Sequence, residues 1–383
     1  MKKRAFLSGV ASTLLMSSHS LNAAEGIAYD VRYQRPSNDT DEGGFWGYMD
    51  REEEKLKKSP FLIRDRKFKE YLTNITCELG QNHCPDIRVY PLTVPLFNAS
   101  MAPNGMMQIW SGLMLRVDNE AQLSAILGHE IGHYLARHTI ARFRDSKSRS
   151  NLGFLTGFLG AVGAIANFGL TAGAYSYSRE HETSADEIGL QLMSKAGYDP
   201  SEAATVWQNL QDEMKSSPDG EASGFQQLFS THPLPQDRQA NLSKIASVSP
   251  GKIKNEEIWQ EKVAPYIRNW LKDEIKRNKF ESSITLLNRL TLRESNKAEY
   301  LFARGEAFRL RSKGDDYQSA IRDYELAANS VNPPAETYKG LGLIYKSRNE
   351  KELAKLNFLK YQVLEPNASD SMLIKSYLEE LET

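Results

Sequence analysis

Residues 119–133 read NEAQLSAILGHEIGH, and this stretch decides the fold of the chain around it. Asn119 can cap a helix, and Gln122 stands at the reciprocal position of a capping box. The apolar period that follows predicts a helix from Asn119 to about Phe143. Because short β-like runs precede it and helical patterns dominate the rest, the predicted class is mainly α with a small β-sheet.

Two histidines of this stretch have the spacing of metal ligands. His129 and His133 lie four residues apart, so both imidazoles project from one face of the helix. Neutral imidazoles suit Zn²⁺, and Glu130, beside the first histidine, is placed to take a proton from a water molecule at the metal. The pattern HExxH therefore predicts one zinc ion per chain and a hydrolytic reaction.

A third protein ligand is expected from the next helical stretch, residues 178–195. Glu182 and Asp186 lie four residues apart there, so both can face the first helix. Glu182 would complete a His₂Glu site and leave the fourth position to water. Asp186 could accept the far N–H of a ligand histidine and fix its tautomer and orientation. The alternative reading of this acidic pair is an ordinary solvated helix face.

The remaining histidines are weaker candidates. His232 follows a polar loop, and three roles are open to it: oxyanion stabiliser, latch in the open metal position, or plain loop histidine before a proline. Arg238, in the same segment, is the other candidate for the oxyanion. We place His138 on the opposite face of the first helix, as a packed histidine. His181 points away from its neighbour Glu182 and is not expected to bind the metal.

The composition is that of an ordinary globular chain. Its 383 residues predict two domains or three small ones. Hydrophobic residues make up 40% and charged residues 25%, which excludes a disordered chain and a polytopic membrane protein. With 48 Lys and Arg against 49 Asp and Glu, the chain has no basic excess for non-specific nucleic-acid binding, so we expect no nucleic-acid partner.

Residues 1–24 read as a cleaved secretory signal. A basic start at residues 2–4 precedes an apolar and small run at residues 5–16, and the segment ends in small residues. The alternative, a membrane anchor, is disfavoured because the run is shorter than the ~20 residues of a membrane span. An exported chain meets an oxidising compartment, so Cys77 and Cys84, its two cysteines, are candidates for a disulfide.

Further segments follow the signal. Residues 25–60 are polar, and we expect an irregular segment there that leads into a charged helix at the charge run of residues 50–58. Residues 61–250 contain the metal motifs and form the predicted metallopeptidase domain. Its β-like runs are residues 87–90, 93–101 and 106–110.

Two parts of this domain could contact other molecules. Asn98 and Ala99 lie in the run that we expect at the sheet edge, onto which an extended peptide could add as a further strand. Residues 151–174 carry no charge and include six glycines. A membrane crossing there would separate the two halves of the metal site, so we expect a packed hairpin or a flap over the cleft, with peripheral membrane contact possible.

Residues 263–383 alternate between amphipathic helices, and a repeat is visible. Ala298 aligns with Ala335 at an offset of 37, and Ala320 aligns with Ala354 at an offset of 34. Small residues let helices approach closely, and aromatic residues fill the gaps. The pattern resembles tetratricopeptide repeats in three degenerate copies, whose curved surface we expect to bind a partner. An unrelated helical bundle is the alternative.

Together, the motifs resemble the HtpX-like, CAAX-protease-related zinc metallopeptidases. The resemblance rests on HExxH, on ExxAD beginning at Glu182, on the hairpin of residues 98–105, and on HPxxxxR at residues 232–238. It implies a zincin-type fold of the gluzincin kind. The residues it implies are two histidine ligands, a glutamate ligand, a catalytic acid/base and a carboxylate behind the ligands: His129, His133, Glu182, Glu130 and Asp186.

With a secretory signal and C-terminal repeats, the resemblance also implies a periplasmic protein. Its expected work is peptidase action on misassembled outer-membrane proteins and help to their assembly, with the repeats docking to the assembly machinery. A second hypothesis is a chaperone or adaptor whose repeats do the main work while the protease site stays latched. A third, an integral-membrane protease, requires residues 151–174 to span a bilayer.

Overall fold

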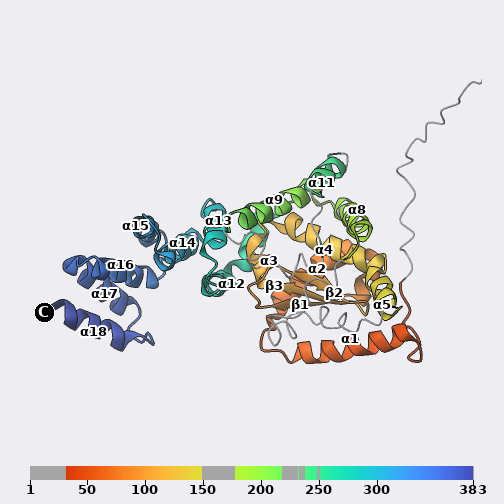
Figure 1. The fold of residues 1–383 in the computed structure, drawn as a ribbon, viewed down its shortest axis with the longest axis horizontal. Helices are drawn as coiled ribbons and strands as arrows, with labels where there is room; N and C mark the ends of the chain where they lie inside the picture. The colour runs from red at the N-terminus through yellow and green to blue at the C-terminus, as the bar shows by residue number, and fades with distance from the viewer. Residues whose placement is uncertain (1–31, 149–176, 218–231, 233–237, 248–250, 383) are drawn as a thin grey trace, which may run out of the picture.

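The computed structural model describes residues 32–148, 177–217, 232, 238–247 and 251–382 (Figure 1). Within them, helices surround one small sheet, which confirms the predicted mainly α class. The described helices are α1 (Asp41–Lys57), α2 (Arg66–Gly80), the 3₁₀ helix η1 (Gln81–Asp86), α3 (Ser111–Arg116), α4 (Glu120–Leu135), α5 (His138–Ser148), α8 (Arg179–Lys195), α9 (Ser201–Lys215), α11 (Arg238–Ala246), α12 (Glu256–Lys276), α13 (Phe280–Leu290), α14 (Lys297–Arg311), α15 (Asp316–Ala328), α16 (Glu336–Ser347), α17 (Lys351–Leu364) and α18 (Ser371–Glu382).

The sheet has the strand order β1-β3-β2. β1 (Arg88–Leu92) runs parallel to β3 (Met106–Trp110), and β2 (Ala99–Met101) pairs antiparallel with β3 and lies at the edge. The predicted run 93–101 is therefore a strand only in its last three residues. Pro95 lies in the irregular part and has no N–H to give to a strand ladder.

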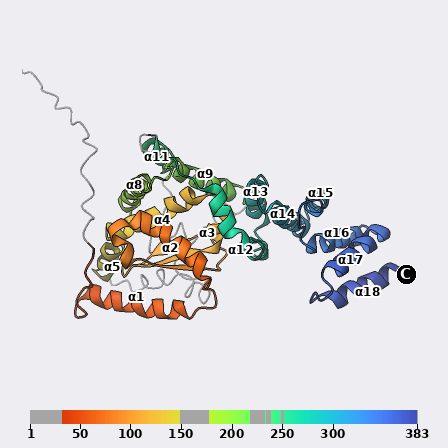
Figure 2. The same cartoon turned by 180° about the vertical axis from the view of Figure 1, so that it is seen from behind.

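Alternate strand residues build two cores on opposite faces of the sheet. Val89 and Ile109 belong to the larger core, which α2 and α4 cover. Tyr90 and Trp110 belong to a second core on the other face, which α1 covers. The result is three layers, with the sheet between α1 on one side and α2 and α4 on the other (Figures 1 and 2).

Helix α1 extends over Asp41–Lys57, so the charged helix expected at the end of the irregular segment is confirmed, but it begins well before the charge run at residues 50–58. Thr40 caps the helix by accepting a hydrogen bond from the Gly43 N–H at 3.0 Å. Gly43 is required there, because an added Cβ would lie 1.9 Å from the Ser37 carbonyl oxygen. The glycines and charges hid an apolar face that includes Phe45 and Met49, which are buried against the sheet.

The helix that begins after Asn119 is shorter than predicted. α4 ends at Leu135, and a new helix, α5, begins at His138. Arg137 lies between them with φ +56°, a left-handed conformation that no α-helix continues through. Its guanidinium pairs with Glu42 of α1, which ties this break to the layer below the sheet. The break matters because it changes the direction in which His138 points.

Helices α12 to α18, which we call the arm, extend away from the sheet and the helices around it (Figure 1). The larger core continues without interruption from the sheet into α12, α13 and α14, and it includes Trp259, Leu287 and Tyr300. Beyond them, α15 to α18 pack in two smaller clusters. The domain boundary predicted between residues 250 and 263 thus lies inside one continuous core, and residue 263 falls within α12.

A buried ion-pair network also crosses that boundary. Arg116 of α3 is 1% exposed and donates to Glu213 of α9 at 2.7 Å and to Glu274 of α12 at 3.0 Å. Arg277 and Ser283 also donate to Glu274, at 2.8 Å each. Removing one member would leave a buried charge without its partner, which is strongly destabilising.

The predicted signal, the glycine-rich segment and the cysteine pair remain to be placed in the fold. The signal at 1–24 and the glycine-rich segment at 151–174 lie outside the described residues. Across the ranges that are described, no helix is long and apolar enough to cross a membrane. Cys77 and Cys84 form a disulfide that joins α2 to η1.

Candidate metal centre

Four buried side chains converge, from α4, from α8 and from residue 232, which lies between α9 and α11 in the sequence. His129, His133, Glu182 and His232 each offer one ligand atom, and these atoms lie within 4.8 Å of one another. The two Nε2 atoms of the histidines on α4 are 3.1 Å apart. Glu182 Oε1 lies 3.3 Å from His133 Nε2, and its Oε2 lies 3.6 Å from His129 Nε2. The sequence motifs HExxH and ExxAD are thus brought to one point.

Close packing of α4 against α8 makes this convergence possible. An added Cβ on Gly132 of α4 would lie 2.7 Å from the Ala185 carbonyl oxygen of α8. The missing side chain lets the helices approach until Glu182, at the start of α8, reaches both histidines. The glycine inside HEIGH therefore sets the distance between the two halves of the site.

His129 is oriented by a carboxylate that an arginine holds in turn. Its Nδ1 lies 2.8 Å from Asp186 Oδ1, the arrangement expected for a carboxylate behind a ligand. Arg238 donates two hydrogen bonds to Asp186, at 2.9 and 2.6 Å, and one to Glu182 at 3.1 Å. The guanidinium also stacks over the Trp207 ring at 4.0 Å. Arg238 therefore contacts both the ligand candidate Glu182 and the carboxylate behind His129.

His133 has a different partner, which the sequence analysis did not place there. Its Nδ1 lies 3.0 Å from Nδ1 of His138. The prediction of a packed His138 on the opposite helix face assumed an unbroken helix, and the break at Arg137 makes that position wrong. Tyr177 was also missed; its ring stacks on His133 with centroids 3.9 Å apart. No local pattern indicates either contact, because both depend on how three segments pack.

The carboxylates near the ligands are held in the charged state. Burial opposes ionisation of Glu182, but its close contacts with His232, His133 and His129 hold its pKa below the usual range. Burial likewise opposes ionisation of Asp186, and the Arg238 guanidinium keeps that pKa low. Burial also lowers the pKa of His133, which favours the neutral form that binds metals.

Glu130 stands next to the metal-binding group but is not one of its four members. Its side chain is buried, and its Oε1 lies 3.6 Å from His232 Nε2. Burial raises the pKa of Glu130 above its usual value. A carboxylate with a raised pKa is suited to take up a proton and to release it again.

These residues fit a bound cation. Two imidazoles and a carboxylate are the donor set that zinc-type ions prefer, and three protein ligands leave a position for a reactant. The Nε2 atoms of His129 and His133 lie 3.1 Å apart, so one cation could be bound by both. His181 is not a member of the group, as predicted from its direction.

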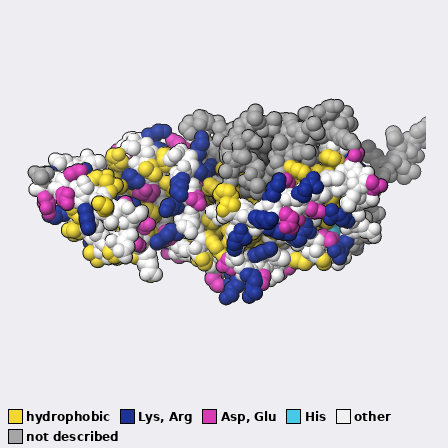
Figure 3. All heavy atoms as spheres, turned by 90° about the horizontal axis from the view of Figure 1, so that it is seen from below, with side chains coloured by type: hydrophobic (Ala, Val, Ile, Leu, Met, Phe, Trp, Pro, Cys, Tyr) yellow, Lys and Arg dark blue, Asp and Glu magenta, His cyan; other side chains and the backbone are white. Residues whose placement is uncertain are grey.

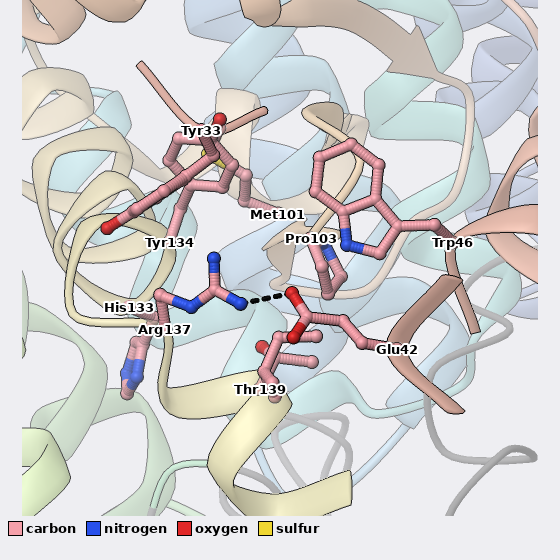
Figure 4. A pocket seen from close by; sticks show the side chains of 10 residues that line it. Tyr33, Glu42, Trp46, Met101, Pro103, His133, Tyr134, Arg137 and Thr139 are labelled. Carbon is pink, nitrogen blue, oxygen red and sulfur yellow. Dashed lines mark hydrogen bonds and ion pairs between the residues drawn. The ribbon is translucent and has the colours of Figure 1, made fainter. Parts of the chain in front are cut away.

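The edge of the sheet lies beside the site. Asn98 accepts a hydrogen bond from the Trp110 N–H at 3.1 Å, and Ala99 pairs with Ile109 in the ladder. A cavity of about 10 Å³, room for one water molecule, lies between the end of β2 and α4. Figure 4 shows its wall, where Arg137 reaches across to Glu42 near Trp46.

All described members of the metal centre lie between residues 129 and 238. Residues 63–246 match the model of Peptidase family M48. The M48 segment, as we call residues 63–246, contains every ligand candidate together with Glu130, Asp186 and Arg238. This match confirms the predicted resemblance to a metallopeptidase family.

Curated proteins similar to this chain include two kinds of protease. The chain is 33% identical over 146 residues to the mitochondrial metalloendopeptidase OMA1 of Schizosaccharomyces pombe, covering 38% of this chain and 42% of that protein. It is 28% identical over 209 residues to the beta-barrel assembly-enhancing protease of Escherichia coli, covering 50% of this chain and 42% of that protein. A putative beta-barrel assembly-enhancing protease of Vibrio cholerae is 28% identical over 212 residues, covering 51% and 42%.

The chain therefore spans less than half the length of each of these relatives. All three relatives are proteases, and the buried histidine and glutamate group of this chain could bind a catalytic metal ion. The predicted type of enzyme, a metallopeptidase, is thereby confirmed at the level of the family.

Proposed function

We propose that the chain is a periplasmic zinc endopeptidase that degrades misassembled outer-membrane proteins and assists their assembly. The observation that carries the peptidase activity is the convergence of His129, His133 and Glu182 beside Glu130. The predicted secretory signal supports the compartment. Similarity to the beta-barrel assembly-enhancing proteases supports the class of substrate.

Each residue of the site has a task in peptide hydrolysis. His129, His133 and Glu182 would hold one Zn²⁺. The ion would polarise the carbonyl of the scissile bond and make the attacking water more acidic. Glu130 takes the proton from that water and delivers it to the leaving amine, a transfer that its raised pKa favours.

Asp186 and Arg238 would act on the ligands rather than on the substrate. Asp186 accepts from His129 and so fixes the ring with Nε2 toward the metal. The donors of Arg238 are engaged with Asp186 and Glu182, which leaves His232 as the better candidate to stabilise an oxyanion.

The substrate would bind as an extended chain. β2 is the edge strand beside α4, so a peptide can pair with it as a further strand. Backbone pairing of this kind selects for unfolded segments rather than for one side chain. Asn98, just before β2, and Ala99, its first residue, are the residues from which we expect this pairing to start.

The helical arm would dock to the outer-membrane assembly machinery. Support comes from its consecutive helices α14, α15, α16 and α17, since a surface of stacked helices can bind a partner. Apolar side chains are exposed on it, among them Leu356 at 51% and Val363 at 80%. Figure 3 shows hydrophobic side chains between charged ones over the arm. Residues 151–174 could add a peripheral contact with the membrane.

Two matched glutamine variants test the activity. Glu130→Gln should keep the zinc content but abolish hydrolysis of an unfolded outer-membrane protein, because only the proton acceptor is removed. Glu182→Gln keeps the side-chain volume but removes the anionic ligand, so zinc measured by elemental analysis should fall sharply. Full zinc in the Glu182 variant would show that Glu182 is not a ligand, and hydrolysis by the Glu130 variant would overturn the proposed mechanism.

A second candidate function is a chaperone or adaptor whose protease site rests closed. One observation favours it: His232 Nδ1 lies 3.2 Å from His129 Nε2 and 3.0 Å from Glu182 Oε1, within the ligand group itself. A fourth protein ligand would fill the position that the attacking water needs. Cells that carry Glu130→Gln separate the two functions, since an adaptor would keep its effect on outer-membrane assembly and a peptidase would lose it.

A further inference from the structure

We propose that His138 is a positioning residue of the metal centre, which accepts a hydrogen bond from Nδ1–H of His133 and so fixes the ring with Nε2 toward the metal. The inference rests on the proposed function, because it assumes that His133 binds a metal. It assigns a role to a buried histidine that takes no part in the reaction itself.

The direction of the hydrogen bond follows from the geometry. Nε2 of His133 faces the ligand group, 3.1 Å from His129 Nε2 and 3.3 Å from Glu182 Oε1. A nitrogen that binds a metal carries no proton, so the proton of the neutral ring sits on Nδ1. That Nδ1 lies 3.0 Å from His138 Nδ1, which must therefore offer its lone pair. His138 is then neutral, with its own proton on Nε2.

The surroundings hold His138 in this position. It is the first residue of α5, placed there by the left-handed Arg137 that ends α4. Its side chain is 7% exposed, and its ring stacks on His181 of α8 with centroids 4.2 Å apart and planes 24° from parallel. Tyr177 stacks on the other partner, His133, at 3.9 Å. Both rings of the hydrogen-bonded pair are thus fixed from the side of α8.

The two histidine ligands therefore donate hydrogen bonds to different kinds of acceptor. His129 donates to the carboxylate of Asp186 at 2.8 Å, whereas His133 donates to a neutral imidazole. A partner behind a ligand fixes its tautomer, and loss of such a partner weakens metal binding about 10–100-fold. His138 should therefore contribute to zinc affinity although it lies outside the ligand group.

Zinc affinity of the full chain, measured by competition with a chromophoric chelator, tests this role. His138→Phe keeps a ring to stack on His181 but has no acceptor, so the dissociation constant should rise about 10–100-fold. His138→Asn places an amide oxygen near the position of Nδ1 and should restore much of the affinity. His181→Phe is the matched control, because it changes the neighbouring histidine to the same residue and leaves the acceptor in place.

A second measurement does not depend on whether a variant folds. In the zinc form of the unaltered chain labelled with ¹⁵N-histidine, we expect an Nδ1–H signal from His133 and scalar coupling across the hydrogen bond to Nδ1 of His138. Equal zinc affinity in the unaltered and His138→Phe chains, or a His133 ring protonated on Nε2, would overturn the inference and leave the peptidase proposal standing. Failure of the unaltered chain to bind zinc would overturn both.

Discussion

His232 lies among the ligand atoms of the metal centre, not at its margin. Its Nδ1 approaches both His129 and Glu182, and its Nε2 lies 3.6 Å from Glu130 Oε1. A ring in this place competes with a water molecule for the fourth position at the metal. The position suits a latch that keeps water from the fourth position at the metal.

We predict that His232→Ala raises the hydrolysis of an unfolded protein, because the fourth position becomes free for water. The three remaining ligands should keep the zinc content unchanged, which elemental analysis checks. If His232 instead stabilises the oxyanion, turnover should fall by about 10²–10³, as for other lost oxyanion donors. The sign of the change in turnover decides between the two roles.

At the scale of elements, the crossing of α4 and α8 positions the ligands. We predict that Gly132→Ala lowers both zinc content and the melting temperature, because the new Cβ would lie 2.7 Å from the Ala185 carbonyl oxygen and would push the helices apart. Gly44→Ala is the matched control: Gly44 lies in α1 with no atom near its missing Cβ. That change should stabilise the chain by roughly 0.5–1 kcal/mol. Undiminished zinc in the Gly132 variant would show that the crossing is not set by this contact.

The buried ion pairs between α3, α9 and α12 lead to a second prediction at this scale, on how the stability of the folded chain depends on pH. Burial opposes ionisation of Glu274, but Arg116 and Arg277 hold its pKa at about 2, below its ordinary 4.5. A lowered pKa means that the carboxylate stabilises the folded chain above pH 4.5 and that this stabilisation is lost as the pH falls toward 2. At neutral pH the contribution is at most about 3 kcal/mol.

Urea unfolding of the metal-free chain at pH 7, 4 and 3 measures this effect. The difference in free energy of unfolding between the unaltered chain and Glu274→Gln should be largest at pH 7 and should shrink as the pH falls. A difference that stays constant with pH would mean that Glu274 titrates normally in the folded chain.

At the scale of the whole molecule, the peptidase body and the start of the arm share one core. Removal of residues 263–383 would cut α12 and would leave Arg116 without Glu274, so we expect that truncated chain not to fold. Removal of residues 312–383 keeps α12 to α14, and this chain should fold and bind zinc. It should also lose association with outer-membrane assembly partners, as a pull-down can measure. Undiminished association would place the docking surface outside α15–α18.

Local spacing alone was enough to predict much of the metal centre. Residues four apart share a helix face whatever the helix packs against, so His129 and His133 could be paired from sequence, as could Glu182 and Asp186. The helices of the arm could be placed in the same way, because small and aromatic residues recur at fixed offsets.

Contacts between segments far apart in the sequence were decided only by the tertiary structure. His138 reaches His133 because α4 breaks at Arg137, and no periodicity marks that break. The burial of α1 against the sheet was hidden for a similar reason, since its glycines and charges mask the apolar face. The single core that joins the sheet to α14, and the contact of Arg116 with Glu274 158 positions along the chain, likewise bring together distant segments. Helical geometry repeats every few residues, so the face of a helix can be predicted from the local sequence. Packing between distant segments depends instead on the relative positions of whole helices and strands in the folded chain.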